Sequence, residues 1–332
     1  MCEAQIFGYP LTAFYAFKQA EEDAVAGRLA STGWETMLEG LLHAGLSVHG
    51  TWPMRSERGG RTNDSGGRTN DIGTNALASS ILLVCRPRSD DAPLATRKDF
   101  LAALKTELPI ALRHLQQGSI APVDLAQAAI GPGMGTFSRY SKVVEADGSP
   151  MTVRTALGLI NQVLDETLAE QESDFDPDTR WALAWFEQHG TNPGLFGVAE
   201  TLSKAKNTAL NGLVAAGIVM SRAGRVRLLD RDELPPIWDP AVDARLTVWE
   251  VTQHLIRALD TGGEAQAAEL LRRIGGRGEA ARGLAYRLFT LCERKKWAKE
   301  ALAYNALVVA WPEIARLAAE APAEAPAQQT LV

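Results

Sequence analysis

The chain has 332 residues, of which 46% are hydrophobic and 22% are charged, and its formal net charge is −6. This composition predicts a folded protein with a real core and excludes a disordered chain. The acidic balance excludes a globally basic nucleic-acid binder but is compatible with a local basic patch. The length permits two or three domains.

Cysteine and histidine usage argues against a metal centre. Cys2, Cys85 and Cys292 are far apart, and no CxxC pair is present. Such a set predicts neither a disulfide framework nor a zinc site, and it favours a reducing, cytoplasmic location. The five histidines show no paired ligand spacing. We find no signal peptide and no apolar run of about 18 residues, so we expect no membrane association.

Residues 1–90 read as strand, helix, strand, long loop and strand. Leu11 to Phe17 predicts a buried strand, and "STGWETMLEGLLHAG" predicts an amphipathic helix that ends at Gly45. "LSVHGTW" alternates like a strand, and "SSILLVCRP" is typical of a strand covered on both faces. We expect a right-handed parallel crossover followed by an antiparallel last strand. This order closes the sheet of S-adenosylmethionine-dependent methyltransferases, although other α/β sheets also end in a hairpin.

The loop of that predicted hairpin contains a tandem duplication. GGRTND occurs at 59–64 and again at 66–71. Gly, Asn and Asp favour turns, and seven extra residues in an exposed loop cost only on the order of a few tenths of a kcal/mol. One interpretation is a neutral duplication. The other is a basic loop that contacts phosphate through Arg58, Arg61 and Arg68.

Ligands of open parallel sheets bind beyond the carboxyl ends of the strands. The segments next to the last two predicted strands therefore supply candidate residues for the edge of an active site. These candidates are Trp52, Arg55, Glu57, Asn75 and Ser79. Trp52 suits stacking on a base, and Arg55 suits pairing with a phosphate or with Glu57. The alternative is that Trp52 packs the strand end and that Arg55 makes an internal ion pair.

A glycine-rich stretch, "IGPGMGTFS" at 130–138, resembles a phosphate-binding loop. No clear strand precedes it, and the lysine of a P-loop is missing. We therefore expect Gly131, Gly133 and Gly135 to form a sharp turn of the chain, with nucleotide binding as the alternative.

The pattern from residue 97 onward is mostly helical. Helices are predicted at 100–116 with a bend at Pro109, along "SPMTVRTALGLINQVLDETLAEQ", and at 176–189. The acidic "SDFDPD" before the last of these is expected to cap it. Three or four stacked helices are predicted from 246 to 319, followed by a disordered tail at 321–332.

Residues 191–235 predict two short helices and a β-hairpin with a tight "AGR" turn, which is the order of a winged helix. Residues 201–231 carry a local surplus of five positive charges. Cations of this kind give phosphate contacts and a strong salt dependence of binding. The candidate DNA-binding residues are Lys204, Lys206, Asn207, Arg222, Arg225 and Arg227. The alternative is a winged helix that only packs or contacts proteins.

Long stretches of the chain resemble the carboxyl-terminal part of predicted adenine-specific DNA methylases, a family of large prokaryotic proteins described as containing a zinc ribbon. The similarity extends from about Tyr9 to Ala319 and is carried by "YPLTAFYAFKQAE", "ASTGWETMLEGLLHAGLSVHGTWPMRSE", "NALASSILLVCRPR", "LRHLQQGSIAPVDLAQAAIGPGM", "DGSPMTVRTALGLINQVLDE" and "YNALVVAWPEIARLA". The resemblance implies a Rossmann-like methyltransferase domain, S-adenosylmethionine as cofactor, and transfer of a methyl group to the amino nitrogen of adenine. The glycine-rich cofactor loop, the Asp-Pro-Pro-Tyr motif and the zinc ribbon are absent from this sequence.

We therefore expect an α/β fragment, the end of a Rossmann-like methyltransferase sheet with an antiparallel last strand, followed by a mainly α-helical region with a winged-helix-like segment. The expected divisions are 1–90, 91–190, 191–235, 236–320 and the tail. The predicted function is a carboxyl-terminal portion or subunit of a DNA adenine methyltransferase, a transferase inactive alone that contacts DNA. Its missing amino-terminal portion would be a separate chain. The alternatives are a non-enzymatic DNA-binding or adaptor protein and a truncated remnant.

Overall fold

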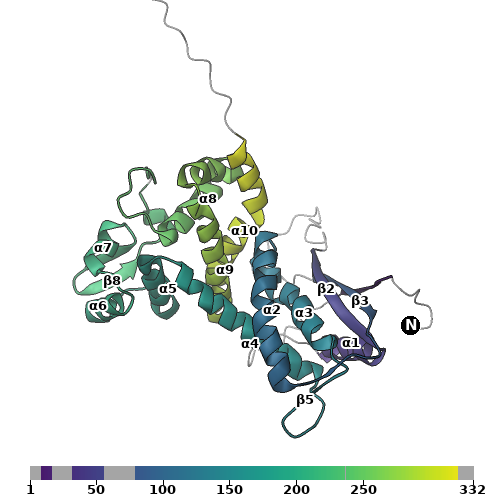
Figure 1. Cartoon of the computed structure of the whole chain (residues 1–332). Helices are drawn as coiled ribbons and strands as arrows, with labels where there is room; N and C mark the ends of the chain where they lie inside the picture. The colour runs from purple at the N-terminus through teal and green to yellow at the C-terminus, as the bar shows by residue number, and fades with distance from the viewer. Residues whose placement is uncertain (1–8, 17–31, 56–78, 236, 321–332) are drawn as a thin grey trace, which may run out of the picture. The chain divides into compact units, whose positions relative to one another are not determined.

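The computed structural model describes residues 9–16, 32–55, 79–235 and 237–320. The fold is mixed α/β and mostly helical, and the described residues form three small sheets (Figure 1). The chain divides into two compact units, Met1–Gly118 with Asp124–Thr167, and Ser119–Val123 with Leu168–Val332. The domain boundaries predicted from the sequence are not tested by this division and remain predictions. Within the described ranges, every helix is too short or too polar to cross a membrane.

The first unit contains a three-stranded sheet, a two-stranded sheet and most of four helices. Its elements in chain order are β1 (Leu11–Ala16), α1 (Thr32–His43), β2 (Leu46–Arg55), β3 (Ser79–Pro87), β4 (Leu94–Thr96), α2 (Arg97–Gln117), α3 (Pro122–Ser138), β5 (Lys142–Val144) and α4 (Val153–Glu170). The first residues of α3 and the last residues of α4 belong to the second unit.

The strand order of the larger sheet is β1-β3-β2, and β3 is antiparallel to both neighbours. The predicted antiparallel last strand is confirmed. β1 and β2 run in the same direction, as expected, but β3 lies between them. Arg55 pairs with Ser79, and Ala16 pairs with Ser80. The last residues of β1 and β2 and the first residues of β3 therefore lie at the same end of the strands. The duplicated segment connects β2 to β3 and lies outside the described residues.

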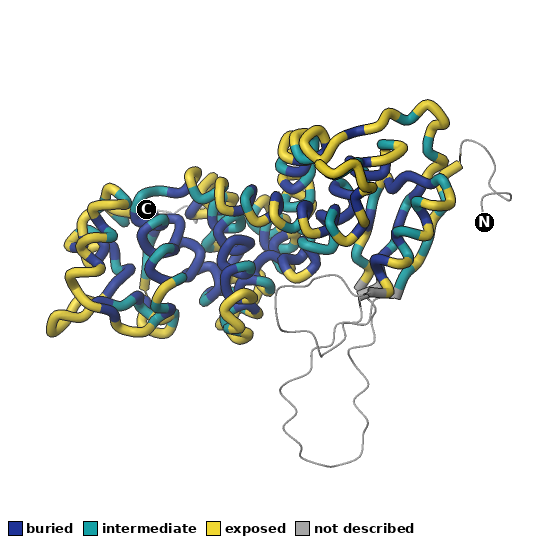
Figure 2. The backbone as a smooth tube through the Cα atoms, turned by 90° about the horizontal axis from the view of Figure 1, so that it is seen from below, coloured by how far each residue is buried: buried dark blue, intermediate teal, exposed yellow. Residues whose placement is uncertain are grey.

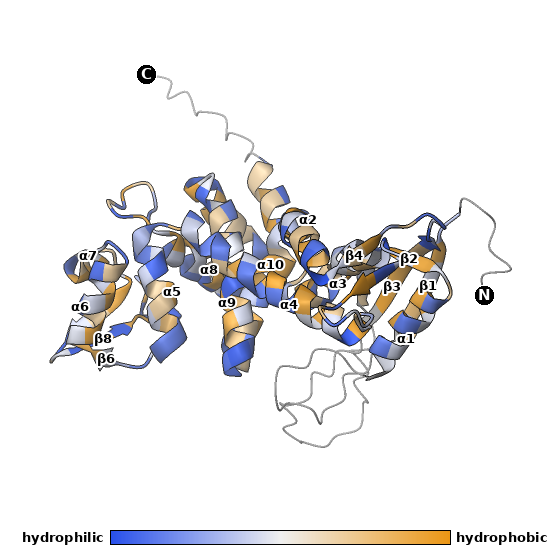
Figure 3. Cartoon of the chain, turned by 60° about the horizontal axis from the view of Figure 1, so that its bottom comes forward, coloured by the Kyte–Doolittle hydropathy of each residue, from blue (hydrophilic) through white to orange (hydrophobic). Residues whose placement is uncertain are grey.

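The two faces of this sheet differ in burial. On one face Leu83 and Cys85 of β3 are fully buried, and Tyr15 of β1 contacts Trp34 of α1 with ring centroids 5.2 Å apart. On the other face Phe14 is 72% exposed, and its partner in register, Leu82, is half-buried. The prediction that β3 is covered on both faces is therefore wrong for the described residues. Figure 3 shows the apolar colouring of β3 along its length.

Helix α3 packs on the buried face of the sheet and contains the glycine cluster. The predicted turn at 130–138 is wrong, because these residues are helical and Pro132 lies inside the helix. A Cβ atom on Gly131 would lie 2.4 Å from Thr51 Oγ1, and one on Gly135 would lie 3.2 Å from the Val48 carbonyl oxygen. The two glycines are four residues apart, so they share one face of the helix. They let α3 lie directly against the backbone of β2.

The second unit contains a small three-stranded sheet and a group of long helices. Its elements in chain order are α5 (Pro177–His189), β6 (Gly194–Leu195), α6 (Phe196–Ala205), α7 (Leu210–Ala215), β7 (Val219–Arg222), β8 (Arg225–Leu228), a 3₁₀ turn (Arg231–Glu233), α8 (Val248–Ile274), α9 (Arg277–Lys295) and α10 (Ala298–Ala319). The predicted cap of α5 is confirmed, since the Asp176 carboxylate accepts from the Thr179 amide at 2.8 Å.

The long helices α8, α9 and α10 confirm the predicted stack from 246 to 319. Their shared core includes large aromatic residues that are almost fully buried, namely Tyr286, Tyr304 and Trp311. The Tyr304 hydroxyl bonds to Gln253 of α8 at 3.3 Å, which satisfies a polar atom inside the core. Figure 2 shows buried residues gathered where helices of the chain pack against one another.

Candidate nucleic-acid interface

A small antiparallel sheet organises the segment that the sequence predicts to bind DNA. Its strand order is β6-β8-β7, with β8 in the centre (Figure 1). The β7–β8 turn places Ala223 at φ 51° and Gly224 at φ 73°. Two consecutive residues with positive φ are typical of a type I′ hairpin turn, whose twist matches that of the flanking strands. Val226 and Leu228 of β8 are buried, which fixes the inner face of the sheet.

Three helices complete this segment. Helix α5 precedes β6, α6 follows it, and α7 leads into the hairpin. The Trp181 indole of α5 donates to the Ala199 carbonyl of α6 at 3.2 Å, and Leu213 of α7 is fully buried. The order is therefore helix, strand, helix, helix and hairpin, held by a common apolar core.

A buried carboxylate anchors the connection between α6 and α7. Asp178 of α5 accepts from Arg245 Nε at 2.6 Å and also accepts from the Thr208 hydroxyl. Burial by itself would raise the pKa of Asp178, but the hydrogen bonds from Arg245 and Thr208 outweigh it and lower this pKa. Asp178 is therefore charged and fully partnered at neutral pH.

The outer face of the small sheet is cationic and apolar. Arg225 of β8 lies between Leu195 of β6 and Arg222 of β7, and Met220 pairs with Arg227. Arg222 and Arg225 are exposed, and neither forms an ion pair within the described parts of the chain. Both guanidinium groups are therefore available to an anionic partner.

Two of the predicted cations are already neutralised. Arg227 pairs with Glu233 at 2.5 Å, and this hydrogen bond lowers the pKa of Glu233 to about 2. Arg231 is largely buried and pairs with Glu300 at 2.5 Å. The local surplus of five charges counted on sequence therefore overstates the free positive charge of this surface.

The remaining candidates lie at the far end of α6. Lys204 is in its last turn, Lys206 is its C-cap, and Asn207 follows at φ 58°. The Phe196 amide at the start of α6 donates to the Gly224 carbonyl in the hairpin turn at 3.0 Å. The lysines and the hairpin arginines are thus at opposite ends of α6. A helical rise of about 1.5 Å per residue separates these ends by about 12 Å. Together they make two cationic points, which we call the wing cations (Lys204, Lys206, Arg222 and Arg225).

Exposed apolar side chains accompany the wing cations, and they form a surface that was not predicted from the sequence. Leu195 is 56% exposed, Val198 43% and Phe196 40%. The signal available in the sequence was the run "GLFGV" at 194–198, where apolar residues are consecutive and not spaced for one helix face.

The candidate residues of the methyltransferase sheet edge are only partly described. Trp52 lies in β2, pairs with Leu82 and is 51% exposed, so it does not pack the strand end. Arg55 and Ser79 face each other in register at the edge where the sheet ends. The side chains of Arg55 and Ser79, and the whole of Glu57 and Asn75, lie outside the described residues. Their roles stay predictions.

Comparisons with known proteins bear on the second unit. Residues 176–331 match a family described as a domain of unknown function (DUF8807). No curated protein matches the chain, and no solved structure matches it. The matched region includes the whole small sheet and the long helices α8 to α10. The resemblance to adenine-specific DNA methylases stays a prediction.

Proposed function

We propose that residues 177–228 form a winged helix that binds DNA, in a chain that is the carboxyl-terminal portion of an S-adenosylmethionine-dependent DNA adenine methyltransferase. The observation that carries the DNA-binding half is the order α5, β6, α6, α7, β7, β8 with exposed, unpaired Arg222 and Arg225 on the hairpin. A cytoplasmic location follows from the same proposal.

The wing cations would supply the sequence-independent part of binding. Arg222 and Arg225 sit on a short, stiff hairpin, so they can reach phosphate groups without ordering a long loop. In helix-turn-helix proteins the second helix enters the major groove. Its counterpart here, α7, exposes Asn211, a side-chain type that pairs with adenine.

The sheet of the first unit supports the methyltransferase half. β1 and β2 are parallel to each other with a reversed β3, and the outer edge of β1 has no strand partner among the described residues. An unpaired strand edge beside the exposed Phe14 suits the addition of another strand. We propose that the missing methyltransferase portion pairs there as a separate chain.

This chain does not itself fit the cofactor. The residues that resemble a phosphate-binding loop lie within α3, where Gly131 contacts Thr51 and Gly133 contacts Ile160 of α4. A glycine packed against a protein neighbour leaves no room for a phosphate. S-adenosylmethionine would therefore bind to the missing portion, and this chain would be inactive alone.

The DNA-binding proposal is tested by the salt dependence of duplex binding. We expect log K to fall steeply with log salt for the wild-type chain, measured by fluorescence anisotropy between 50 and 200 mM salt, the range in which phosphate contacts dominate. Replacing Arg222 and Arg225 by Ala should make this slope less steep by about 2, because each lost phosphate contact changes it by about 0.9. Arg227 is left intact, since it pairs with Glu233.

The matched control replaces two exposed cations of the same unit, Lys295 and Lys299, and so removes the same charge. We expect its slope to equal that of the wild type. An unchanged slope for the hairpin variant, or an equal change in the control, would remove the hairpin from DNA binding.

The methyltransferase half is tested with labelled S-adenosylmethionine and duplex DNA. We expect no methyl transfer by this chain alone, and transfer after co-expression with a chain that carries the cofactor loop and the Asp-Pro-Pro-Tyr motif. Replacing Phe14 by Glu should abolish that restoration and leave the folding of this chain unchanged, because Phe14 is 72% exposed. Robust transfer by the chain alone would contradict the proposal.

A second candidate function is a non-enzymatic adaptor that binds a protein through the same surface. The exposed Leu195, Phe196 and Val198 favour it, since apolar side chains gathered on a surface mark sites of protein association. Replacing Leu195 and Val198 by Ser separates the two functions. DNA binding by the wing cations should survive this change, whereas an adaptor would lose its partner.

A further inference from the structure

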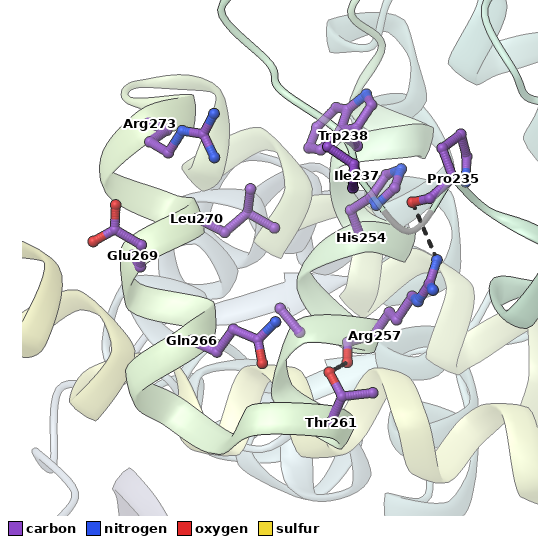
Figure 4. Close-up of a pocket in the computed structure, with 11 residues that line it drawn as sticks. Pro235, Ile237, Trp238, His254, Arg257, Thr261, Gln266, Glu269, Leu270 and Arg273 are labelled. Carbon is purple, nitrogen blue, oxygen red and sulfur yellow. Dashed lines mark hydrogen bonds between the residues drawn. The ribbon is translucent and has the colours of Figure 1, made fainter.

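A bend in α8 creates a pocket that the proposed DNA-binding surface does not use. Gly263 has φ 69° and ψ −166° and divides α8 into two arms. The pocket lies between these arms and the segment that contains Trp238, and its volume is about 400 Å³ (Figure 4). Pockets of about 300 to 1,000 Å³ are the usual size for small organic ligands.

One buried polar atom in this pocket has no partner. His254, in the first arm of α8, is 6% exposed and lines the pocket, and its Nε2 has no hydrogen-bond partner in the described structure. Burial lowers the pKa of His254 to about 4, so the imidazole is neutral at physiological pH. The Trp238 ring stacks on it with centroids 4.0 Å apart, which fixes its plane. This nitrogen is covered in the structure, and it would gain a hydrogen bond if the entry of a ligand exposed it.

The second arm of α8 faces His254 with complementary chemistry. Figure 4 shows Gln266 and Leu270 extending toward the first arm. The Gln266 amide can donate and accept at once, and amide side chains of this kind pair with the edge of a purine base. Leu270, with Trp238 and Ile237, supplies apolar surface for a ring.

Positive charge lies at the rim of the pocket. Arg257 donates to the Leu234 carbonyl at 2.6 Å and so holds one wall in place. Arg273 pairs with Asp239 at 2.6 Å and is 41% exposed, so it can turn to an anion in the pocket. Glu269, the acid that lines the pocket, pairs with Arg272 outside it. The described residues contain no group of three or more His, Cys, Asp or Glu side chains that could hold a metal ion.

We propose that this pocket binds a purine nucleoside monophosphate, with the base between the arms of α8 against His254 and Gln266 and the phosphate at Arg273. This site goes beyond the proposed DNA binding and does not depend on it. It places a small-molecule site within the region 176–331, in the same unit as the wing cations.

Calorimetric titration of the full chain tests the proposal with AMP, adenosine, UMP and inorganic phosphate. We expect AMP to bind at least tenfold more tightly than each of the other three, because each lacks the phosphate, the purine or the whole nucleoside. Gln266→Ala and Arg273→Ala should each weaken AMP binding at least fivefold. Both side chains are exposed, so both variants should fold, as circular dichroism would verify.

Lys299→Ala is the control, because Lys299 is an exposed cation of the same unit that does not line the pocket. We expect it to bind AMP as the wild type does. Absence of AMP binding at millimolar concentration would overturn the proposal. Equal binding of phosphate and AMP would also overturn it, since it would show an anion site without a base site. Equal binding of UMP would refute recognition of the purine.

Discussion

The contact between α3 and β2 gives a prediction whose size follows from the structure. Replacing Gly131 by Ala would add a Cβ atom 2.4 Å from Thr51 Oγ1 and 2.6 Å from the Thr51 amide nitrogen, whereas ordinary contacts begin near 3.4 Å. The Thr51 amide nitrogen and Cβ are fixed by the strand backbone, so rotation of the hydroxyl alone does not relieve the overlap. Helix and strand must therefore separate by about 1 Å.

Three effects set the magnitude. Overpacking of this kind costs about 1–3 kcal/mol. The separation also weakens the hydrogen bond from Thr51 Oγ1 to the Ala128 carbonyl, now 3.1 Å, which is worth about 1 kcal/mol. Alanine returns about 1 kcal/mol of helix propensity. We expect Gly131→Ala to lower the free energy of unfolding by about 1–3 kcal/mol.

Gly158 provides the control for this substitution. It lies in α4, is exposed, and a Cβ atom there would meet nothing within 4 Å. Gly158→Ala should therefore stabilise the protein by up to about 1 kcal/mol. Urea unfolding followed by circular dichroism gives both values, and hydrogen exchange of the β2 and α3 amides localises the change. A Gly131→Ala variant as stable as Gly158→Ala would refute the close-packing role of α3.

Two further predictions concern buried charge in the second unit. Burial, and to a lesser extent Asp243, raises the pKa of Glu250 from 4.5 to about 8, so the unfolded chain releases this proton at lower pH than the folded protein does. Glu250 therefore lowers stability by about 1.4 kcal/mol per unit as pH rises through this interval. Glu250→Gln should remove that dependence, and urea unfolding from pH 5 to 8 against the wild type would show parallel curves if the reasoning fails. Arg245→Ala should lower the free energy of unfolding by about 2–4 kcal/mol, because it leaves the buried Asp178 carboxylate without its cation. Lys105→Ala breaks an exposed ion pair with Glu166 and should lower this free energy by less than about 1 kcal/mol. Equal losses of stability in thermal unfolding would contradict the distinction between buried and exposed pairs.

Several elements were predictable because their signals are local. The strand at 11–16, the reversed strand at 79–87 and the hairpin at 219–228 follow from alternation, apolar runs and a glycine turn. The cap of α5 by Asp176 follows from a motif of a few residues. Such patterns are decided within one or two turns of chain and do not depend on distant neighbours.

The role of the glycines was not predictable from their spacing. Gly131 and Gly135 read as a turn or a phosphate loop, because glycine weakens a helix. In the structure they are helical, and Thr51 and Val48, far earlier in the sequence, account for their small size. Glycine permits both a tight turn of the backbone and the close approach of a helix to a neighbouring strand. Only the residue packed against the glycine shows which of these two roles it has.

By itself the sequence determined local elements, such as the hairpin at 219–228 and the cap of α5, and the positions of the basic residues, since each depends on neighbouring residues alone. Tertiary structure decided which of those charges remain free. Arg227 and Arg231 look alike in sequence to Arg222 and Arg225, yet the first pair is neutralised by Glu233 and by Glu300, the latter 69 residues away from Arg231. The pocket at His254 likewise exists only because α8 bends at Gly263. Electrostatic pairing and cavity shape depend on distances through space, and the linear order of residues does not contain them.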